Sequence, residues 1–451
     1  MYMMTEAPIS EKSIICMRRI IHPVGQGAFY TEDFYGQNGY VGLVVYDCGT
    51  TKKAEKERLK EEIKRLPEGK DVDILFISHF DKDHVCGIKD LMQGRKIKRV
   101  VIPQISGFEW FYLVQDACVS KPWVGYRVNK HFFDTITELT HSDNVGEVIE
   151  VNSINGEEYR LGNAEFPNNR KPEEGNVTHE RPELDANTNQ QIEEAGNVDV
   201  IPDAKRSYIN SGDNVYLDNV KVWEYIPFNY TDGRDIKDLK NRINSILRDE
   251  LLKAGYYSID QVPYQEVCAI IEPYLPKINN EYKDIFGCSN ASSMCVYSGC
   301  TQNTYLNSFE GHFLFAYNIY EDIFANREGC LYTGDSILHN SNKLSFIISK
   351  LNKRNIHIGT LQIPHHGSFR NLDEDALDEM ETKGIKPNIF FASYGTKNRY
   401  RHPSKTLMKM LSLRKWSDEN GLIYSSNIIG ISDNPSYYMV ESFLFQVVYN
   451  Q

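Results

Sequence analysis

The chain has 451 residues and a formal net charge of -12, with 41% hydrophobic and 25% charged residues. This balance is typical of a globular protein and excludes a fully disordered, collagen-like or low-complexity chain. The acidic net charge argues against broad electrostatic capture of nucleic acid, so any affinity for a polyanion must be local.

No apolar run approaches the ~18 residues of a membrane helix, and residues 1–19 lack the apolar core of a signal peptide. We therefore expect a soluble, cytoplasmic protein with no membrane partner. Nine cysteines without a Cys-x-x-Cys pair fit a reducing compartment. Zinc could in principle bind to four of them, but their spacing matches no ribbon or finger, so ordinary thiols are favoured for Cys288, Cys295, Cys300 and Cys330.

Strand and helix signals alternate along the chain, which indicates mixed α and β structure. The first part predicts strands at 14–21, 41–46, 74–77 and 100–102 and a charged helix at 52–65. The middle part holds an aromatic, helical stretch at 108–139, a segment rich in Asn, Pro, Glu and Gly at 166–206, a strand at 220–226 and a core-packing helix at 235–254. The last part predicts strands at 293–297, 313–317, 361–363 and 389–392 and helices at 342–351, 373–382 and 404–413. We expect residues 166–206 to form a mobile insertion.

The segment that follows the strand at 74–77 is the most informative one. Four potential metal ligands fall within six positions, namely His79, Asp81, Asp83 and His84. A loop at the end of a strand can turn several such side chains toward one point, and imidazole and carboxylate together suit zinc, manganese or iron. The alternative is a solvated loop in which Asp81 or Asp83 caps a helix.

Three later strands also end in polar turns. The side chains that follow them are Asp335, the pair His365 and His366, and the set Asn398, Tyr400 and His402. Each turn alone leaves a structural role open, such as a turn cap or a hydrogen-bonded histidine. Four such turns in one chain are hard to explain as coincidence, and they favour one common site.

Four cations lie close to the last of these turns, at Lys397, Arg399, Arg401 and Lys405. In a chain of net charge -12, this local group indicates an anionic substrate. A solvated surface turn is the alternative.

In this order, the motifs resemble the metallo-β-lactamase superfamily, and in it the branch typified by the soluble hydrolase domain of the competence protein ComEC. Further matches to that branch are the segment Val24-Gly25-Gln26-Gly27-Ala28, the strand end Tyr46-Asp47-Cys-Gly49, the segment Asn290-Ala-Ser-Ser293 and the closing motif that begins at Ser393. The resemblance covers about 19–100 and 289–410. It implies an αββα sandwich whose halves are residues 1–104 and 288–451. Residues 105–287 would be a large, partly helical and partly flexible insertion that acts as a lid or partner surface.

The resemblance also implies a site for two divalent metal ions, zinc or manganese. His79 and Asp81 would hold the first ion, Asp83, His84 and His365 the second, and Asp335 would bridge them. The side chains expected beside the ligands or the substrate, but not on the metal, are Asp47, His366 and Ser368. One more histidine is often present in the family, and none of the four available lies in a recognisable motif: His131, His141, His179 and His312.

The function implied by the resemblance is phosphodiester hydrolysis, in particular by a nuclease, with hydroxide presented between two ions. Asp83 could accept the proton of the attacking water. Asn398 and Tyr400 would donate hydrogen bonds to phosphate oxygens, and His402 could protonate the leaving oxygen. The substrate would be DNA, bound with the help of Lys397, Arg399 and Arg401.

Some hydrolases of this branch look similar to effectors of anti-phage defence systems, so activation by a protein partner is a further hypothesis. Two alternatives stay open. One is hydrolysis of a small phosphodiester or a phospholipid headgroup under an aromatic lid. The other is a non-catalytic partner-binding module that kept the fold.

Overall fold

The structure is a computed structural model of the chain. It describes residues 12–105, 109–119, 131–153, 205–218, 220–230, 233–286, 293–301, 310–315, 319–323, 329–338, 342–354, 356–417, 423–434 and 439–448. None of the helices in these ranges is both long enough and apolar enough to cross a membrane.

Ten strands form the first sheet, in the order β12-β11-β19-β1-β2-β3-β4-β5-β6-β7. Their bounds are β1 Lys12–Ile21, β2 Phe29–Gly36, β3 Gly39–Cys48, β4 Val72–Phe76, β5 Ile97–Pro103, β6 Val145–Asn152, β7 Arg206–Asn210, β11 Glu310–Phe315, β12 Ile319–Ile323 and β19 Met439–Val448. Strands β3 to β7 run parallel to one another. Their carboxyl ends therefore lie at one edge of the sheet.

Seven strands form the second sheet, in the order β18-β15-β14-β13-β10-β9-β8. Their bounds are β8 Val215–Leu217, β9 Val220–Phe228, β10 Cys295–Cys300, β13 Cys330–Tyr332, β14 Thr360–Gln362, β15 Ile389–Ser393 and β18 Asn427–Ile431. Strands β13, β14, β15 and β18 run parallel to one another. A separate pair joins β16 Trp416–Ser417 to β17 Ile423–Tyr424.

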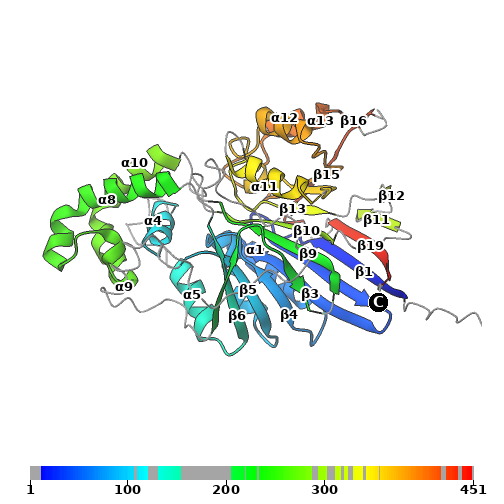
Figure 1. Cartoon of the computed structure of the whole chain (residues 1–451), viewed down its shortest axis with the longest axis horizontal. Helices are drawn as coiled ribbons and strands as arrows, with labels where there is room; N and C mark the ends of the chain where they lie inside the picture. The colour runs from blue at the N-terminus through cyan, green and yellow to red at the C-terminus, as the bar shows by residue number, and fades with distance from the viewer. Residues whose placement is uncertain are drawn as a thin grey trace, which may run out of the picture.

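Helices cover the outer faces of the two sheets (Figure 1). The helices are α1 Lys53–Lys64, α2 Lys82–Val85, α3 Ile88–Leu91, α4 Glu109–Val119, α5 His131–His141, α8 Gly233–Ala254, α9 Tyr264–Ile271, α10 Leu275–Phe286, α11 Asn342–Asn352, α12 Glu374–Thr382 and α13 Lys405–Leu413. Short 3-10 turns are η2 Ile259–Gln261, η3 Glu272–Tyr274 and η4 His365–Gly367. Helices α12 and α13 are each preceded by an N-cap residue whose side chain accepts a hydrogen bond from a backbone N–H of the first turn. These residues are Asp373 and Ser404.

Three hydrophobic clusters correspond to these layers. One lies between the sheets and includes Tyr30, Tyr46 and Phe391. A second packs the first sheet against helices that include α4, α5, α8 and α10, and a third packs the second sheet against α11, α12 and α13. Two sheets between outer helices are the αββα arrangement expected from the sequence, which is confirmed.

The predicted insertion, residues 105–287, contributes to both sheets. Strands β6 and β7 extend the first sheet, and β8 and β9 form one edge of the second. Its helices share a core with the first sheet. The segment expected to be mobile, 166–206, lies outside the described residues except for its last two positions. The division of the chain at 104 and 287 stays a prediction.

A buried ionic network also joins the two sheets. The guanidinium of Arg19 on β1 donates to Glu32 on β2 at 2.7 Å and to Glu441 on β19 at 2.7 Å. Glu32 in turn accepts hydrogen bonds from the hydroxyls of Tyr225 and Tyr332 on the second sheet. Each buried charge thus has several partners, which is the condition for keeping charges in a protein core.

Candidate metal centre

The candidate site lies where loops at the carboxyl ends of strands from both sheets converge. Asp47 lies at the end of β3, Asp83 and His84 belong to α2 just after β4, and His365 and His366 form η4 after β14. Asp335 follows β13. The polar turns that the sequence predicted therefore meet at one edge.

Glycines allow the loop that carries Asp83 to pack closely on its neighbours. A Cβ atom at Gly49 would lie 2.5 Å from the carbonyl oxygen of Asp83, and one at Gly27 would lie 2.7 Å from the Cα atom of Thr50. The backbone N–H of Ala28 donates to the same Asp83 carbonyl at 3.0 Å. The glycine-rich segment at 24–28 thus packs against the candidate ligand loop.

A Gly49→Ala substitution should lower the free energy of unfolding by about 1–3 kcal/mol, because the new methyl group would overlap backbone atoms of Asp83 and His84. It should also reduce the amount of bound metal, because the loop must move. Gly36→Ala is a matched control, since its Cβ would meet only Val41, at 3.2 Å. Chemical denaturation and metal analysis of both variants would test this. Equal stability of the two variants would contradict it.

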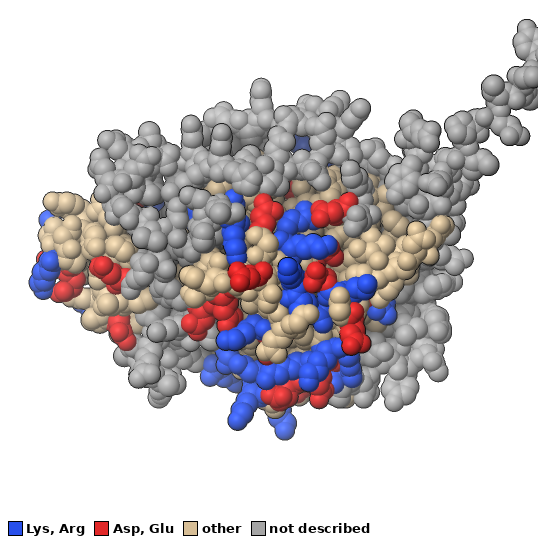
Figure 2. Space-filling view, turned by 90° about the horizontal axis from the view of Figure 1, so that it is seen from below, with Lys and Arg blue, Asp and Glu red and all other residues tan. Residues whose placement is uncertain are grey.

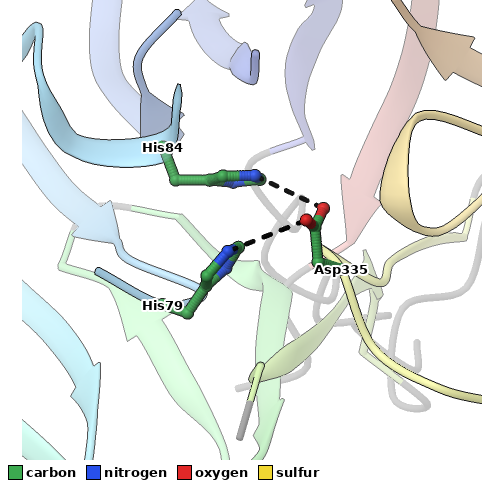
Figure 3. Close-up of side chains that lie close together, drawn as sticks. All are labelled: His79, His84 and Asp335. Carbon is green, nitrogen blue, oxygen red and sulfur yellow. Dashed lines mark ion pairs between the residues drawn. The ribbon is translucent and has the colours of Figure 1, made fainter. Parts of the chain in front are cut away.

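His79, His84 and Asp335 form the first group of potential ligands (Figure 3). The Nε2 atom of His84 lies 3.3 Å from Oδ1 of Asp335, and Nε2 of His79 lies 3.8 Å from Oδ2. Both Nε2 atoms are buried, and among the described residues neither has a hydrogen bond of good geometry. Two buried ring nitrogens that face one carboxylate in this way fit a divalent metal ion.

Asp47 holds both of these rings in place. Its Oδ2 accepts from Nδ1 of His84 at 2.8 Å and from the hydroxyl of Ser78 at 2.7 Å. The Ser78 hydroxyl lies 2.9 Å from Nδ1 of His79 and accepts from it, since its own proton goes to Asp47. When neutral, both rings therefore carry their proton on Nδ1 and present the lone pair of Nε2, as metal-binding histidines do. The orienting role of Asp47 stays a prediction, and these contacts support it.

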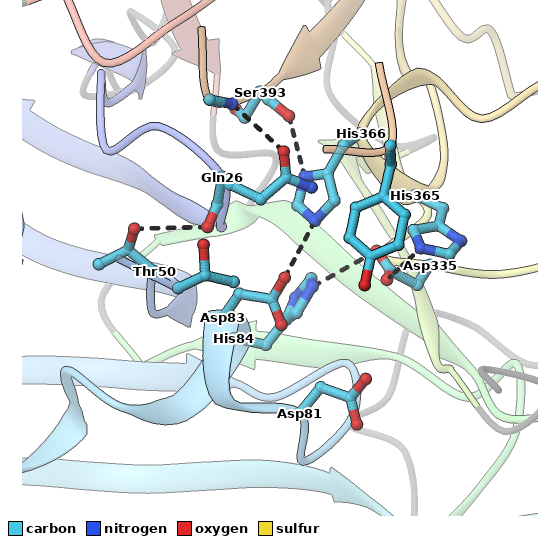
Figure 4. A network of polar contacts seen from close by, with 12 residues as sticks. Gln26, Thr50, Asp81, Asp83, His84, Asp335, His365, His366 and Ser393 are labelled. Carbon is cyan, nitrogen blue, oxygen red and sulfur yellow. Dashed lines mark hydrogen bonds and ion pairs between the residues drawn. The ribbon is translucent and has the colours of Figure 1, made fainter. Parts of the chain in front are cut away.

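His366 belongs to a second group, with Asp83 and His84 (Figure 4). Its Nδ1 donates to the carbonyl of Ser393 at 2.9 Å, and its Nε2 lies 3.3 Å from Oδ2 of Asp83. The ring therefore lies within the ligand group, whereas the sequence-based assignment placed it beside the ligands.

His365 lies near the Asp335 oxygen that does not face His84. Its Nε2 lies 3.6 Å from Oδ2 of Asp335, the oxygen that also faces His79, and its Nδ1 lies 3.3 Å from Oδ1 of Asn371. The sequence-based assignment put His365 with Asp83 and His84. Both histidines have left-handed backbone angles, with φ of 50° and 55°, so their rings point in different directions.

Charges within the cluster shift several pKa values. Burial alone would raise the pKa of Asp83, but the hydrogen bond from His366 and nearby imidazoles outweigh it and lower that pKa to about 2. Burial disfavours the charged form of His84, yet the carboxylates of Asp335 and Asp47 raise its pKa well above the usual value. The pKa of His366 is also raised, by Asp83 and Asp335, against the effect of burial. Without metal, the contacts within the cluster therefore favour the anionic form of Asp83 and the protonated forms of His84 and His366.

The turn at 395–402 lies beside this cluster. The rings of His365 and His402 are 5.6 Å apart. The side-chain amide of Asn398 donates to the carbonyls of Gly395 and His402, and its oxygen accepts from the backbone of His402. Asn398 therefore holds its own turn, whereas the sequence predicted a bond to substrate. Burial and the nearby imidazoles lower the pKa of His402 to about 4.

The remaining predicted residues are placed as follows. The four cations Lys397, Arg399, Arg401 and Lys405 are exposed, and Ser368 is buried and accepts from the backbone of Arg370. Asp81 is largely buried, with Oδ2 3.7 Å from Nε2 of His79. His141 is exposed, and its Nδ1 atom lies within hydrogen-bond distance of the Thr137 carbonyl in α5. The side chains of His131 and His312 are not described. His179 and Cys288 lie outside the described residues. Cys295, Cys300 and Cys330 are not joined in disulfides.

Three residues at the site were not predicted from the sequence. Ser293 accepts from the backbone of Asp335, Gln362 accepts from the backbone of Thr333, and Asn371 donates to the carbonyl of Asp335. They fix the loop that carries the shared carboxylate. Isolated Ser, Gln and Asn residues carry no spacing signal, so only Ser293, which lies in a matched motif, could have been found.

Comparisons with known proteins agree with this arrangement. Residues 38–146 match the model of the family described as the Metallo-beta-lactamase superfamily, a range that includes the ligand loop at 79–84. No curated protein matches the chain. One similar solved structure is the crystal structure of a long form RNase Z from yeast, with 10% identity and a TM-score of 0.26. That match covers 94% of this chain but only 41% of the other, and a score this low carries no functional argument. Residues 38–146 are thus similar to a metallo-β-lactamase superfamily domain, and the described sheets and helices have the αββα arrangement.

Proposed function

We propose that the protein is a metal-dependent phosphodiester hydrolase, in particular a nuclease that uses two divalent ions. The observation that carries this proposal is the position of Asp335 between two groups of ligands. One of its oxygens faces His84, and the other faces His79 and His365. A carboxylate in this position is suited to bridge two cations.

The proposed ligands follow from these distances. His79, Asp81 and His365 would hold the first ion, and Asp83, His84 and His366 would hold the second, with Asp335 shared. His365 then supplies the histidine that the sequence motifs left unassigned. Imidazole and carboxylate donors fit zinc or manganese.

Bound ions at this site would supply an activated water for attack on phosphorus and offset the charge of the transition state. A pKa of about 2 makes Asp83 a weak base, so its proposed role is to hold metal and not to accept a proton. His402, with a pKa of about 4, is neutral near pH 7, and nearby cations would lower its pKa further. We therefore assign His402 a hydrogen bond to a substrate oxygen.

The charge around the site favours an anionic polymer. Lys397, Arg399, Arg401 and Lys405 are exposed on the turn and helix beside His402. The face shown in Figure 2 has acidic side chains interspersed among the basic ones. In a chain of net charge -12, four exposed cations on one turn and the helix after it are a local feature, which suits the phosphates of a nucleic acid such as DNA.

The helical part of 105–287 supports the ligand loop directly. Phe80, between the proposed ligands His79 and Asp81, packs edge to face on Tyr112 of α4 and Phe132 of α5. A partner that binds these helices could therefore influence the ligand loop. Activation by such a partner and a role in anti-phage defence belong to this proposal.

The experiment is to incubate purified protein, loaded with zinc or manganese, with single-stranded DNA, duplex DNA, RNA and a small chromogenic diester. An Asp83→Ala, His84→Ala double variant is the control. We expect the wild type to cut at least one polynucleotide and the double variant to cut none. Cleavage of only the small diester would favour a small-substrate hydrolase. A metal-loaded wild type that cuts nothing would favour the binding module.

A further inference from the structure

A series of neighbouring rings leads from the candidate metal centre to the surface. The ring of His402 lies 5.6 Å from His365 and 5.8 Å from Tyr400, and the planes of His402 and Tyr400 differ by 14°. At the outer end, the guanidinium of Arg399 lies 5.1 Å from the centre of the Tyr400 ring and donates to its hydroxyl at 3.0 Å. Tyr400 is still 53% exposed.

A second exposed aromatic lies on the adjoining turn. Phe369 is 42% exposed and comes three residues after His366. The two turns are joined, because the backbone of Ser404 donates to the carbonyl of Gly367 at 2.8 Å. A Cβ at Gly367 would overlap Pro403, so the turns also touch. Among the described residues, only five large apolar side chains are exposed, and two of them lie on these turns.

Exposed aromatic rings beside cations are suited to unpaired nucleobases. Every base offers a π face, and stacking on an aromatic side chain is tolerant of sequence. In a duplex, these faces are already covered by neighbouring bases. A small diester or a lipid headgroup could be bound by the cations alone, because it has no series of bases that could stack on the aromatic side chains.

We propose that Tyr400 and Phe369 form a stacking platform for unpaired bases, and that the substrate is therefore a single-stranded nucleic acid whose phosphates lie along Arg399, Arg401 and Lys397. Cleavage of that strand rests on the proposed hydrolase function, but binding does not. The phenol ring of Tyr400 makes the proposed contact, and its hydroxyl accepts a hydrogen bond from Arg399.

The test measures binding without cleavage. Fluorescence anisotropy would follow a labelled 12-nucleotide single strand titrated with metal-free protein in EDTA. Tyr400→Ala and Phe369→Ala should each weaken binding by about 5- to 150-fold. The slope of log affinity against log salt should stay the same, since no charge is removed. Tyr400→Phe should restore binding, and Tyr257→Ala, which removes an 81% exposed tyrosine from another part of the chain, is the matched control.

A second measurement needs no variant. A strand with abasic sites keeps its phosphates but lacks bases, so wild-type protein should bind it at least as weakly as Tyr400→Ala binds the intact strand. Duplex affinity equal to single-strand affinity, with no loss for the abasic strand, would overturn the proposal even if the protein is a nuclease. Base-dependent binding by a protein that cleaves nothing would uphold the platform and reject the hydrolase.

Discussion

Replacing Asp335 with asparagine should remove most of the bound metal and slow phosphodiester cleavage by about 1,000-fold or more. The substitution removes a negative charge whose two oxygens face His84 on one side and His79 and His365 on the other. Both ions would lose a ligand, and the several kcal/mol that they contribute to the transition state would be lost with them. Elemental analysis after dialysis and cleavage assays at matched protein concentration would measure both effects.

Asp378→Asn is the control for this variant, because Asp378 lies on α12 with an exposed side chain that pairs with Arg414. It should keep the metal content and the rate of the wild type. Circular dichroism would confirm that Asp335→Asn is folded. Should folded Asp335→Asn retain two ions per chain, the bridging role would be wrong, and with it the division of the ligands into two groups.

The sequence predicted those parts of the fold that have a regular apolar pattern. The strand expected at 41–46 is β3, the strand at 74–77 overlaps β4, and the helix at 235–254 is α8. Strand β2 was missed because it buries two adjacent carboxylates, Glu32 and Asp33. Their partners, Arg19 and Arg18, lie on β1 and neutralise them only after the strands pair. Strand β7 was missed for a similar reason, since Arg206 is buried beside Glu150 of β6.

The sequence could predict which turns form the candidate site, but not how their side chains are arranged. The strand order brings His79, Asp83 and Asp335 together. The recurrence of polar turns at strand ends and the family resemblance had indicated that they belong to one site. The directions of His365 and His366 depend on left-handed backbone angles, which non-glycine residues adopt rarely and which no residue pattern signals. The role of Asn398 depends on which nearby carbonyls its amide can reach, and this also becomes visible only in the folded turn.

Metal uptake near pH 7 should release protons, and the apparent affinity should rise with pH. The raised pKa values of His84 and His366 mean that both rings are protonated more readily in the metal-free protein than free histidine is. A divalent ion must displace those protons, so affinity should increase by up to about tenfold per pH unit for each proton displaced. Zinc titrations in weakly buffered solution with a pH indicator, repeated from pH 6 to pH 8, would count the protons.

The stability of the metal-free protein should change in the opposite direction. A raised folded-state pKa contributes stability that is present below the unfolded pKa of about 6.5 and is lost as pH rises through the folded value. Above about pH 7.5, His22 and His402, whose pKa values are lowered, are neutral in both the folded and the unfolded state. Heating the metal-free protein should therefore give a midpoint that falls with pH in that range, while added zinc stabilises more at higher pH. Asp47→Asn removes one of the carboxylates that raise the pKa of His84 and weakens the orientation of its ring. That variant should bind zinc about 10- to 100-fold more weakly and release fewer protons. An affinity that does not change between pH 6 and pH 8 would show that the rings are already neutral, and the electrostatic account of the cluster would then be wrong.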